Sequence, residues 1–384
     1  MTDLIVVGAG PAGIVAATVA ARAGARVRLF DRAAFPRDKL CGDTVNPGAL
    51  ALLRRLKMAG HLELGGLRVD GMMVTGDDGV AVEARYPGGF YGRAMVRRAL
   101  DWSLLQEALA AGVEFEPLTA VRRALPGEGT QTAVGGVVID VSGSERTLRS
   151  RAVIAADGRH STLTFGLGLA RHPARPRRWA VGAYFENVAG LTSLGEMHIR
   201  RGRYIGVAPV PGDLANVCLV KPWESSAGEF RDPQALLRRE LARDPRLADR
   251  FAGARLVGPP VVLGPLAVDV SAQEIDGLLL AGDAAGFIDP MTGDGMRFAV
   301  RGGELAAQAA LDALQHGWSG VHARLVRQRR HEFAGKWRFN RTLRTLVASP
   351  AAVRVGGAVA SLAPIALRAV VRHAGDCELA AFGA

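Results

Sequence analysis

The stretch GAGPAG at residues 8–13 follows a short apolar run and opens an alanine-rich segment that continues to Ala23. In a strand-to-helix turn, Gly8 permits the tight bend, Gly10 lets the backbone approach a pyrophosphate, and Gly13 lets the helix pack close to the sheet. The helix N-terminus then offers free N–H groups and a partial positive charge to two phosphates. The pattern predicts a dinucleotide-binding turn.

The segments around this turn extend the prediction. The apolar runs 4–7 and 26–30 are typical of strands on either side of a helix, and Asp31 ends the second run, where a carboxylate accepts from a ribose hydroxyl. A buried tight turn could use the same glycines, but the strand, helix and acid in register favour nucleotide binding. The residues expected to bind the nucleotide here are Gly8, Gly10, Ala12, Gly13, Asp31 and Arg32.

Composition and charge limit the classes of protein. The chain has 384 residues, of which 49% are hydrophobic and 22% charged, so it should fold into two or three substructures. The net charge is +11, and residues 316–384 contribute eight of these charges. There is no recognisable nucleic-acid-binding module, so we expect no nucleic-acid partner. The basic tail is either a solvated face or a surface for peripheral contact with anionic lipid or an acidic partner.

Cysteine usage and hydropathy bear on location. The three cysteines lie far apart and form neither a disulfide framework nor a metal-ligand cluster, which fits a reducing cytoplasm. None of the eight histidines has a metal-ligand spacing, so no metal is expected. An export signal and an apolar run of about twenty residues are both absent. We expect a cytoplasmic protein, with the inner membrane surface as the alternative that the basic tail suggests.

The remaining pattern predicts an α/β fold. Helices are expected at 47–58, at 94–111 with Leu100, Leu104, Leu105 and Leu109 on one side, near 233–243, and after Ala281. Strands are expected at 66–92, 113–123, 134–141, 151–156 and through much of 175–264. A β-rich substrate domain therefore interrupts a Rossmann-type domain, and a helical tail follows. The expected boundaries are 1–70, 93–174 and 265–315 for the nucleotide-binding domain, 71–92 and 175–264 for the substrate domain, and 316–384 for the tail.

Two further motifs distinguish between the possible dinucleotides. Residues 155–161 read AADGRHS, and residues 282–296 read GDAAGFIDPMTGDGM. With the glycine turn, they resemble the flavoprotein superfamily of aromatic hydroxylases and geranylgeranyl reductases over about residues 1–315. The resemblance implies FAD, with a helix N-terminus near the flavin that stabilises its reduced, negatively charged form. The FAD-binding residues that it implies are Arg97, Val121, Asp157, Gly158, Gly282, Asp283 at the ribityl chain, Pro290, Gly293, Gly295 and Met296.

The segment FPRDKLCGD at 35–43 indicates a branch of that superfamily. It is similar to the Lys-x-Cys-Gly segment of the geranylgeranyl reductase group, which places Cys41 and Gly42 beside the flavin. Gly286 agrees, because aromatic hydroxylases usually have His at that position. The Trp-x-Trp motif of flavin-dependent halogenases is absent, since no two tryptophans lie two residues apart.

One segment departs from the reductase group. The group has Tyr-x-Trp-x-Phe-Pro along its lipid cavity, and residues 204–209 here read YIGVAP. Tyr204 and Pro209 are kept, whereas Gly206 and Ala208 replace the two aromatic residues and open space. The resemblance implies that these four residues line the substrate cavity, and the lost volume favours a bulkier ring system or a carrier-bound polyketide over a plain polyprenyl chain.

Two side chains have open roles. Cys41 is a candidate catalytic residue that would position a double bond or donate a proton, but cysteine also packs well against a flat ring. Arg97 occupies the place where this superfamily has an arginine on the FAD diphosphate. Arg98 is the alternative, and both could be surface charges.

The resemblance implies an FAD-dependent oxidoreductase. The favoured reaction is reduction of a carbon–carbon double bond in a lipid-like or polyketide substrate, with NADPH or NADH as a transient reductant because no second intact glycine unit is present. The alternative is a monooxygenase that hydroxylates an aromatic or polyketide substrate through a flavin hydroperoxide. A third interpretation makes the flavin structural or an electron carrier in a membrane-surface protein held by the basic tail.

Overall fold

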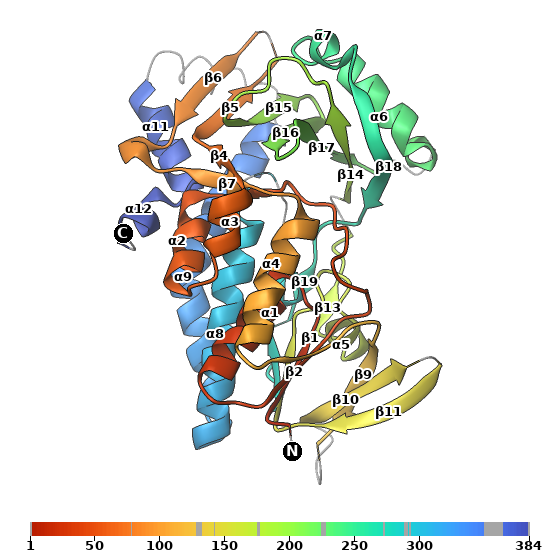
Figure 1. Cartoon of the computed structure of the whole chain (residues 1–384), viewed down its shortest axis with the longest axis vertical. Helices are drawn as coiled ribbons and strands as arrows, with labels where there is room; N and C mark the ends of the chain where they lie inside the picture. The colour runs from red at the N-terminus through yellow and green to blue at the C-terminus, as the bar shows by residue number, and fades with distance from the viewer. Residues whose placement is uncertain are drawn as a thin grey trace.

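The glycine turn joins the first strand to the first helix of a five-stranded parallel sheet (Figure 1). The computed structural model describes residues 2–77, 79–127, 133–141, 143–174, 177–223, 228–271, 273–287, 291, 293–348 and 364–382. The strands run in the order β20 (Leu278–Leu280), β12 (Ala152–Ala155), β1 (Leu4–Val7), β2 (Val27–Phe30) and β8 (Glu114–Glu116). The carboxyl ends of β1, β12 and β20 lead into the three glycine-containing motifs, so parallel pairing brings these motifs to one edge.

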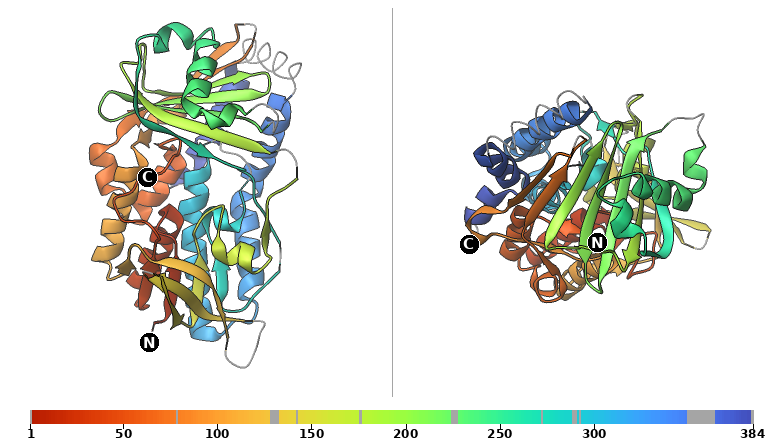
Figure 2. Two further views of the ribbon diagram at one scale, coloured as in Figure 1. Left: turned by 90° about the vertical axis from the view of Figure 1, so that its right-hand side faces the viewer. Right: turned by 90° about the horizontal axis from the view of Figure 1, so that it is seen from above.

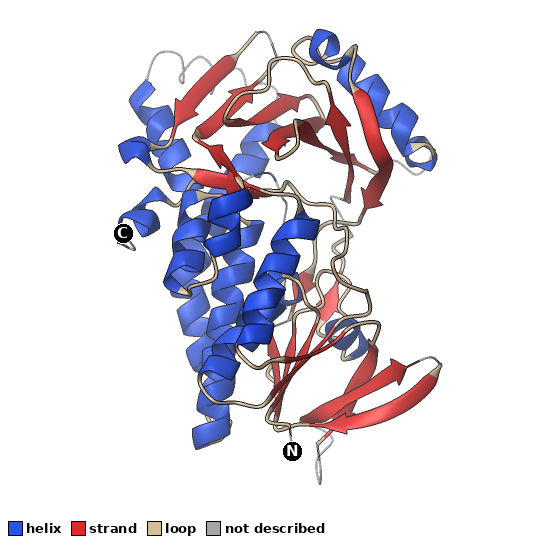
Figure 3. Cartoon of the chain, viewed as in Figure 1, coloured by secondary structure: helices blue, strands red, loops and turns tan. Residues whose placement is uncertain are grey.

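Helices cover one face of this sheet (Figure 3). They are α1 (Pro11–Arg22), α2 (Pro47–Arg55), α3 (Gly60–Gly65), α4 (Arg97–Ala110), α8 (Gly295–His316) and α9 (Val321–Ala348). Helices α1 and α8 touch closely, since a Cβ on Gly303 would lie 2.3 Å from the carbonyl oxygen of Ala12. Three of the four leucines that were predicted to be buried along one side of α4 are buried, namely Leu100, Leu104 and Leu105. The fourth, Leu109, is 39% exposed. Leu109 is nine residues after Leu100, which is about two and a half helical turns, so it lies on the opposite side of α4.

A small antiparallel sheet covers the opposite face. It consists of β9 (Ala120–Pro126), β10 (Val134–Val141) and β11 (Ser144–Arg149), and α5 (Thr162–Gly166) lies beside it. Val137 and Ile139 pack against Ile5 and Val153 of the parallel sheet. The sequence did not predict β11, because its residues are almost all exposed and show no apolar alternation.

The upper part of the molecule is a seven-stranded sheet (Figures 1 and 3). Its order is β18 (Arg255–Leu263), β14 (Arg178–Glu186), β17 (Leu214–Pro222), β16 (Arg203–Val210), β15 (Leu194–Arg200), β5 (Gly71–Thr75) and β6 (Ala81–Arg85). Helices α6 (Pro233–Ala242) and α7 (Ala248–Phe251) pack on one face through a cluster that includes Ile205, Val207 and Leu237. The other face carries the alternate residues of the same strands.

Short elements connect these parts. They are the sheet β3 (Thr44–Val45), β7 (Gly92–Ala94) and β4 (Leu67–Val69), the pair β13 (Ala170–Arg171) and β19 (Asp269–Val270), and the 3-10 turns η1 (Pro87–Gly89), η2 (Glu229–Arg231) and η3 (Gly282–Ala285). The β3–β7–β4 sheet is drawn between the seven-stranded sheet and helices α2 and α3 (Figure 1). It therefore links the upper sheet to the helical layer.

The C-terminal region packs on the nucleotide-binding part. Val321, Leu325 and Phe333 of α9 are buried in the main core, so these apolar residues of the basic tail are covered by protein. Helices α11 (Pro364–Ala374) and α12 (Cys377–Phe382) lie against β6 and α2 (Figure 2). Among the described residues, no helix is long and apolar enough to span a membrane, and no cluster of side chains suits a metal.

Candidate cofactor and substrate site

The three glycines of the first turn have different surroundings. Gly8 has φ +97°, and a Cβ there would lie 2.6 Å from Asp157 Cα, so the second motif packs on the first. A Cβ on Gly13 would lie 1.9 Å from the carbonyl oxygen of Gly8. By contrast, the only described atom within 4 Å of a Cβ on Gly10 is Nη2 of Arg37, at 4.0 Å. The turn therefore leaves free space beside its second glycine, where a pyrophosphate would approach.

Asp31 is held at the rim of this space. Its carboxylate accepts from the backbone N–H of Ala9 at 2.9 Å and from that of Ala33 at 2.9 Å, which leaves further lone pairs for a ribose hydroxyl. Arg32 is exposed next to it. Val121 is buried in the core at the start of β9, and the nearby Thr119 N–H donates to the Asp31 carbonyl at 2.9 Å.

Arg37 lies across the turn, a role that sequence reasoning missed although the residue belongs to the quoted 35–43 segment. Its Nη1 lies 3.3 Å from Asp101 and its Nη2 donates to the Ala9 carbonyl at 3.4 Å. Nη1 is buried and has no hydrogen-bond partner in the described part of the chain. An unsatisfied buried guanidinium beside the open space at Gly10 suits a phosphate oxygen.

The two candidate arginines of α4 point to different places. Arg97 is buried, and its guanidinium bonds Asp101 at 2.7 and 2.8 Å. Arg98 is exposed and pairs with Asp38 at 3.3 Å. Only Arg97 therefore lies within the cluster that surrounds the glycine turn, and its contact with a diphosphate remains a prediction.

The second and third motifs meet the first. Asp157 accepts from the Thr162 N–H at 2.8 Å, and Gly158 has φ +84°. In η3, Gly282 has φ +59°, and a Cβ there would lie 2.8 Å from the Cβ of Ala12. The sequence-distant motifs thus form one continuous backbone surface.

Asp283 is a carboxylate without a hydrogen-bond donor. It makes no hydrogen bond to any residue that the structure describes, and burial raises its pKa, with Arg159, Lys39 and Arg97 acting in the opposite direction. Desolvation, together with Arg159, Arg37 and Arg97, lowers the pKa of Lys39 to about 8, and Asp283 opposes this shift. A half-buried carboxylate whose side chain has no donor in the described protein is suited to the hydroxyls of a ribityl chain.

The N-terminus of α8 completes the surface. Gly293 has φ +68°, Gly295 begins the helix with no other described atom within 4 Å of a Cβ, and Met296 is buried. Pro290 lies outside the described residues. Asp294, just before the helix, accepts from Nζ of Lys336 at 2.9 Å, and both side chains are buried.

The Cys41 loop joins this surface to the seven-stranded sheet. Leu40 occupies the space above Gly182 of β14, where a Cβ would lie 2.2 Å from its Cδ1. The Cys41 carbonyl accepts from the side-chain amide of Asn216 in β17 at 2.9 Å. Gly42 is exposed and has no described atom within 4 Å of a Cβ. Cys41 and Gly42 are therefore held at the boundary between the two parts of the molecule.

A buried polar cluster follows directly. Oδ2 of Asp43 accepts from the Tyr184 hydroxyl at 2.6 Å and from Asn216 at 2.7 Å, and Oδ1 accepts from the Arg97 backbone N–H at 3.2 Å. Burial raises the pKa of Asp43 to about 6 despite these bonds. Asp43 can therefore exchange a proton near neutral pH. The sequence contains one signal for this cluster, since Asn216 is a polar residue in the middle of an apolar strand.

The expected substrate residues of β16 lie on both faces of the sheet. Tyr204, Gly206 and Ala208 alternate with the residues that pack under α6, so they face the same side as Tyr184 and Asn216. A Cβ on Gly206 would lie 3.9 Å from the carbonyl oxygens of Cys218 and Glu196, in ordinary van der Waals contact, so the position would accept a methyl group without a clash. Pro209 falls on the α6 side by the same alternation, away from Gly206.

These residues fit FAD, because the space at Gly10, the unsatisfied Arg37 and the donor-free Asp283 lie along one surface. Comparison with known proteins agrees with this fit. A family model described as FAD binding domain matches residues 1–331. Menaquinone reductase of Mycolicibacterium smegmatis is 30% identical over 97% of this chain and 91% of its own length. Digeranylgeranylglycerophospholipid reductase 2 of Methanopyrus kandleri is 31% identical over 82% and 78%.

A solved structure shares the fold. The flavin-dependent brominase Bmp2 superposes with a TM-score of 0.85 at 20% identity and covers 98% of this chain and 94% of that chain. The comparisons confirm the flavoprotein resemblance, its geranylgeranyl reductase-like branch and the predicted α/β class. The chain belongs to the FAD binding domain family and is an FAD-dependent oxidoreductase.

Proposed function

We propose that this enzyme reduces a carbon–carbon double bond in a lipid-like substrate that carries a ring. The observation that carries the proposal is the Cys41–Asp43 turn. This turn is hydrogen-bonded both to α4 and to the inner face of the seven-stranded sheet, which is the face opposite α6. The similarity to menaquinone and geranylgeranyl-type reductases over most of the chain supports the reaction class. FAD, when bound and reduced, supplies the hydride.

The substrate would lie between the Cys41 turn and the inner face of β16. Tyr204, Gly206 and Ala208 would form one wall of that space, and glycine and alanine take up less volume there than aromatic side chains would. The name of the mycobacterial relative includes menaquinone, an isoprenoid quinone, and a ring-bearing substrate agrees with these small residues. A polyketide ring, free or carrier-bound, would use the same space.

The protein's own residues would position the reactants and deliver a proton. Cys41 lies on the turn that faces the substrate and would hold the double bond against the cofactor. When Asp43 is protonated, its carboxyl group would donate to the Tyr184 oxygen across the 2.6 Å contact, which frees the hydroxyl hydrogen of Tyr184 to point at the substrate. Tyr184 would then give that proton to the carbon adjacent to the one that receives hydride and take the Asp43 proton in exchange. Arg37 and Arg97 would hold the cofactor diphosphate.

We infer that NADPH or NADH reduces the cofactor transiently, because only one intact glycine-rich unit is present in the sequence. The nicotinamide would therefore share the open side of the site with the substrate at a different time. Reduction by a protein donor is the other source of electrons that this arrangement permits.

Anaerobic single-turnover kinetics test the reaction. FAD-loaded enzyme is photoreduced without oxygen and mixed with a menaquinone, a geranylgeranyl lipid or a polyketide quinone, and flavin absorbance and product mass are followed. We expect one substrate to reoxidise the flavin and to keep two added hydrogen atoms after mild oxidation has returned any quinol to the quinone, because a reduced carbon–carbon bond is not reoxidised by that treatment. A product that gains oxygen, with reoxidation only after air is admitted, would instead establish the hydroxylation alternative.

A further inference from the structure

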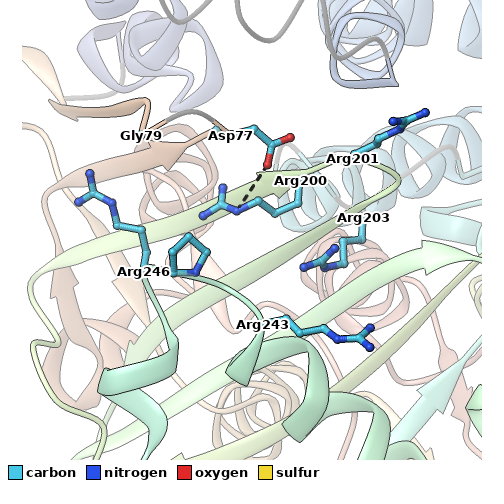
Figure 4. Close-up of a pocket in the computed structure, with 9 residues that line it drawn as sticks. Asp77, Gly79, Arg200, Arg201, Arg203, Arg243 and Arg246 are labelled. Atoms are coloured by element: carbon cyan, nitrogen blue, oxygen red, sulfur yellow. Dashed lines mark ion pairs between the residues drawn. The ribbon is translucent and has the colours of Figure 1, made fainter.

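A second pocket lies at the end of the seven-stranded sheet, where β5 and β15 finish and β16 begins (Figure 4). Its volume is about 420 Å³, which falls in the size range of small-ligand sites. Three sequence-distant segments line it: the β5–β6 connection, the β15–β16 turn and the α6–α7 connection. None of its lining residues belongs to the glycine turns or to the Cys41 loop.

Arg200 and Arg203 lie in the middle of this pocket (Figure 4). Each is oriented by a residue that does not belong to the lining. Arg200 is buried; its Nη2 donates to Asp244 at 2.9 Å and its Nη1 to Thr75 at 3.1 Å. Arg203 lies 2.8 Å from a carboxylate oxygen of Glu240. Because both guanidinium groups are oriented by buried carboxylates, they do not have to be ordered when a ligand binds.

Three more arginines surround the first two. Arg201 and Arg246 are exposed and form no ion pair with any described residue, and Arg243 is 63% exposed at 3.9 Å from Glu240. The one acid among the described lining residues is Asp77, 3.9 Å from Arg200. Arg200 and Arg203 are each paired with a carboxylate outside the lining, so they add no net charge. Among the described lining residues, the surplus of positive charge therefore comes from the three outer arginines, set against Asp77.

We propose that this pocket binds the phosphate or diphosphate group of a small ligand, at a site separate from the FAD surface. Planar guanidinium groups match the oxygen spacing of phosphate and bind it through paired hydrogen bonds. A carboxylate could occupy only one such fork, whereas a diphosphate can engage the oriented central pair and the exposed outer arginines together. None of the described lining residues is aromatic, so recognition rests on the charged group.

Titration of FAD-loaded protein with pyrophosphate tests the proposal, because bound FAD already fills the cofactor's own diphosphate site. Binding is measured by calorimetry at low ionic strength for the wild type and for the double variant Arg201→Gln with Arg246→Gln. The matched control is Arg327→Gln with Arg330→Gln, which removes two exposed arginines of α9 that form no ion pair with any residue that the structure describes. All three proteins are checked for equal thermal stability and FAD content.

We expect saturable binding to the wild type, weakened about tenfold or more in the pocket variant and unchanged in the α9 variant. Equal weakening in both variants would mean attraction to the general positive charge and would overturn the proposal. The absence of saturable binding to the wild type would overturn it as well.

A second arm distinguishes the two sources of such a group, a soluble phosphorylated compound and a phospholipid headgroup. Vesicles of phosphatidylcholine with and without phosphatidic acid are sedimented with each protein. The ligand is a phospholipid headgroup if the vesicles retain the protein only when they contain phosphatidic acid. That retention must also be lost in the pocket variant and be displaced by pyrophosphate. Pyrophosphate binding without vesicle retention assigns the soluble compound.

Discussion

At the scale of single residues, the first turn separates structural glycines from a functional one. Gly8 and Gly13 are required by neighbouring backbone, since a Cβ at either position would lie within 2.6 Å of it. Gly10 is different, because the protein itself leaves the space beside it open. The motif was predictable from the sequence, but this division of roles needed the positions of Asp157 and Arg37.

The variant Gly10→Ala should fold normally and bind FAD poorly. A methyl group there meets only the end of the Arg37 side chain, at 4.0 Å, but it occupies the space expected for the pyrophosphate. We expect FAD affinity to fall about tenfold or more, with the melting temperature of the apoprotein unchanged. Fluorescence titration and thermal unfolding measure the two effects.

Gly60→Ala is the matched control, because no described atom lies within 4 Å of its added methyl and it is remote from the turn. It should change neither quantity. If Gly10→Ala binds FAD as tightly as Gly60→Ala does, the pyrophosphate does not lie at Gly10.

Asp43 should give turnover a dependence on pH. Burial raises its pKa from 3.8 to about 6, while Tyr184, Asn216 and Arg97 act in the opposite direction, so its protonated fraction falls as pH rises through about 6. We expect the rate of flavin reoxidation by substrate to fall over the same range. Asp43→Asn should lower that rate by about 100-fold and remove the pH dependence.

The same shift predicts an effect on stability. Because folding raises this pKa, the contribution of Asp43 to the free energy of unfolding is complete below about pH 4 and is lost as pH rises through about 6. Denaturant unfolding of wild type and Asp43→Asn at pH 5 and pH 8 measures it. Tyr184→Phe serves as a control that keeps the carboxyl group, and it should slow turnover while retaining part of the pH dependence of stability.

A wild-type reoxidation rate that does not vary between pH 5 and pH 8 would exclude Asp43 as the proton source.

At the scale of elements, a buried ion cluster joins α8, α9 and the α11–α12 turn. Nζ of Lys336 lies 2.9 Å from Asp294 and 3.2 Å from Asp376, and it also donates to the Ala374 carbonyl at 3.1 Å. Arg297 lies 3.1 Å from Asp376. The cluster holds the start of α8, the helix end that the sequence assigned to the flavin.

Lys336→Met should destabilise the protein strongly. Methionine keeps most of the side-chain volume but leaves Asp294 and Asp376 without their shared cation, which should cost about 3 to 5 kcal/mol in the free energy of unfolding. Arg338→Met, an exposed change on the same helix, should stay within about 0.5 kcal/mol of the wild type. Chemical denaturation compares them, and similar values for the two variants would mean that the cluster contributes no net stability.

The elements also show which parts of the site a sequence can predict. Motifs that follow a strand at once, such as residues 8–13 and 282–286, were predicted because strand, turn and helix are adjacent in the chain. The Tyr184 and Asn216 bonds to Asp43 join residues 141 and 173 positions apart, and no periodicity signals such contacts. The exposed strand β11 was not predicted, and Leu109 was predicted on the buried side of α4 although it is partly exposed. Exposed positions show little hydrophobic periodicity from which to predict them.

At the scale of the whole molecule, the two sheets divide the work. The three glycine-containing motifs lie on the parallel sheet, and the face of the seven-stranded sheet opposite α6 carries the residues that we propose line the substrate space. The pairing of β5 with β15 could not be predicted, because it is parallel and joins residues 71–75 to 194–198. The basic tail was predicted to be helical, but the contribution of α9 to the main core was not predicted, because the high positive charge of the tail indicated an exposed surface.

Strand β20 lies at the edge of the parallel sheet and is the last strand of the chain to join it. During synthesis, Asp283 and the start of α8 leave the ribosome only after about three quarters of the polypeptide has been made. Until then the growing chain has the first glycine turn but lacks the two segments that we propose bind the ribityl chain and the flavin ring. Cofactor capture should therefore be a late event, and nascent chains shorter than about 300 residues should stay colourless.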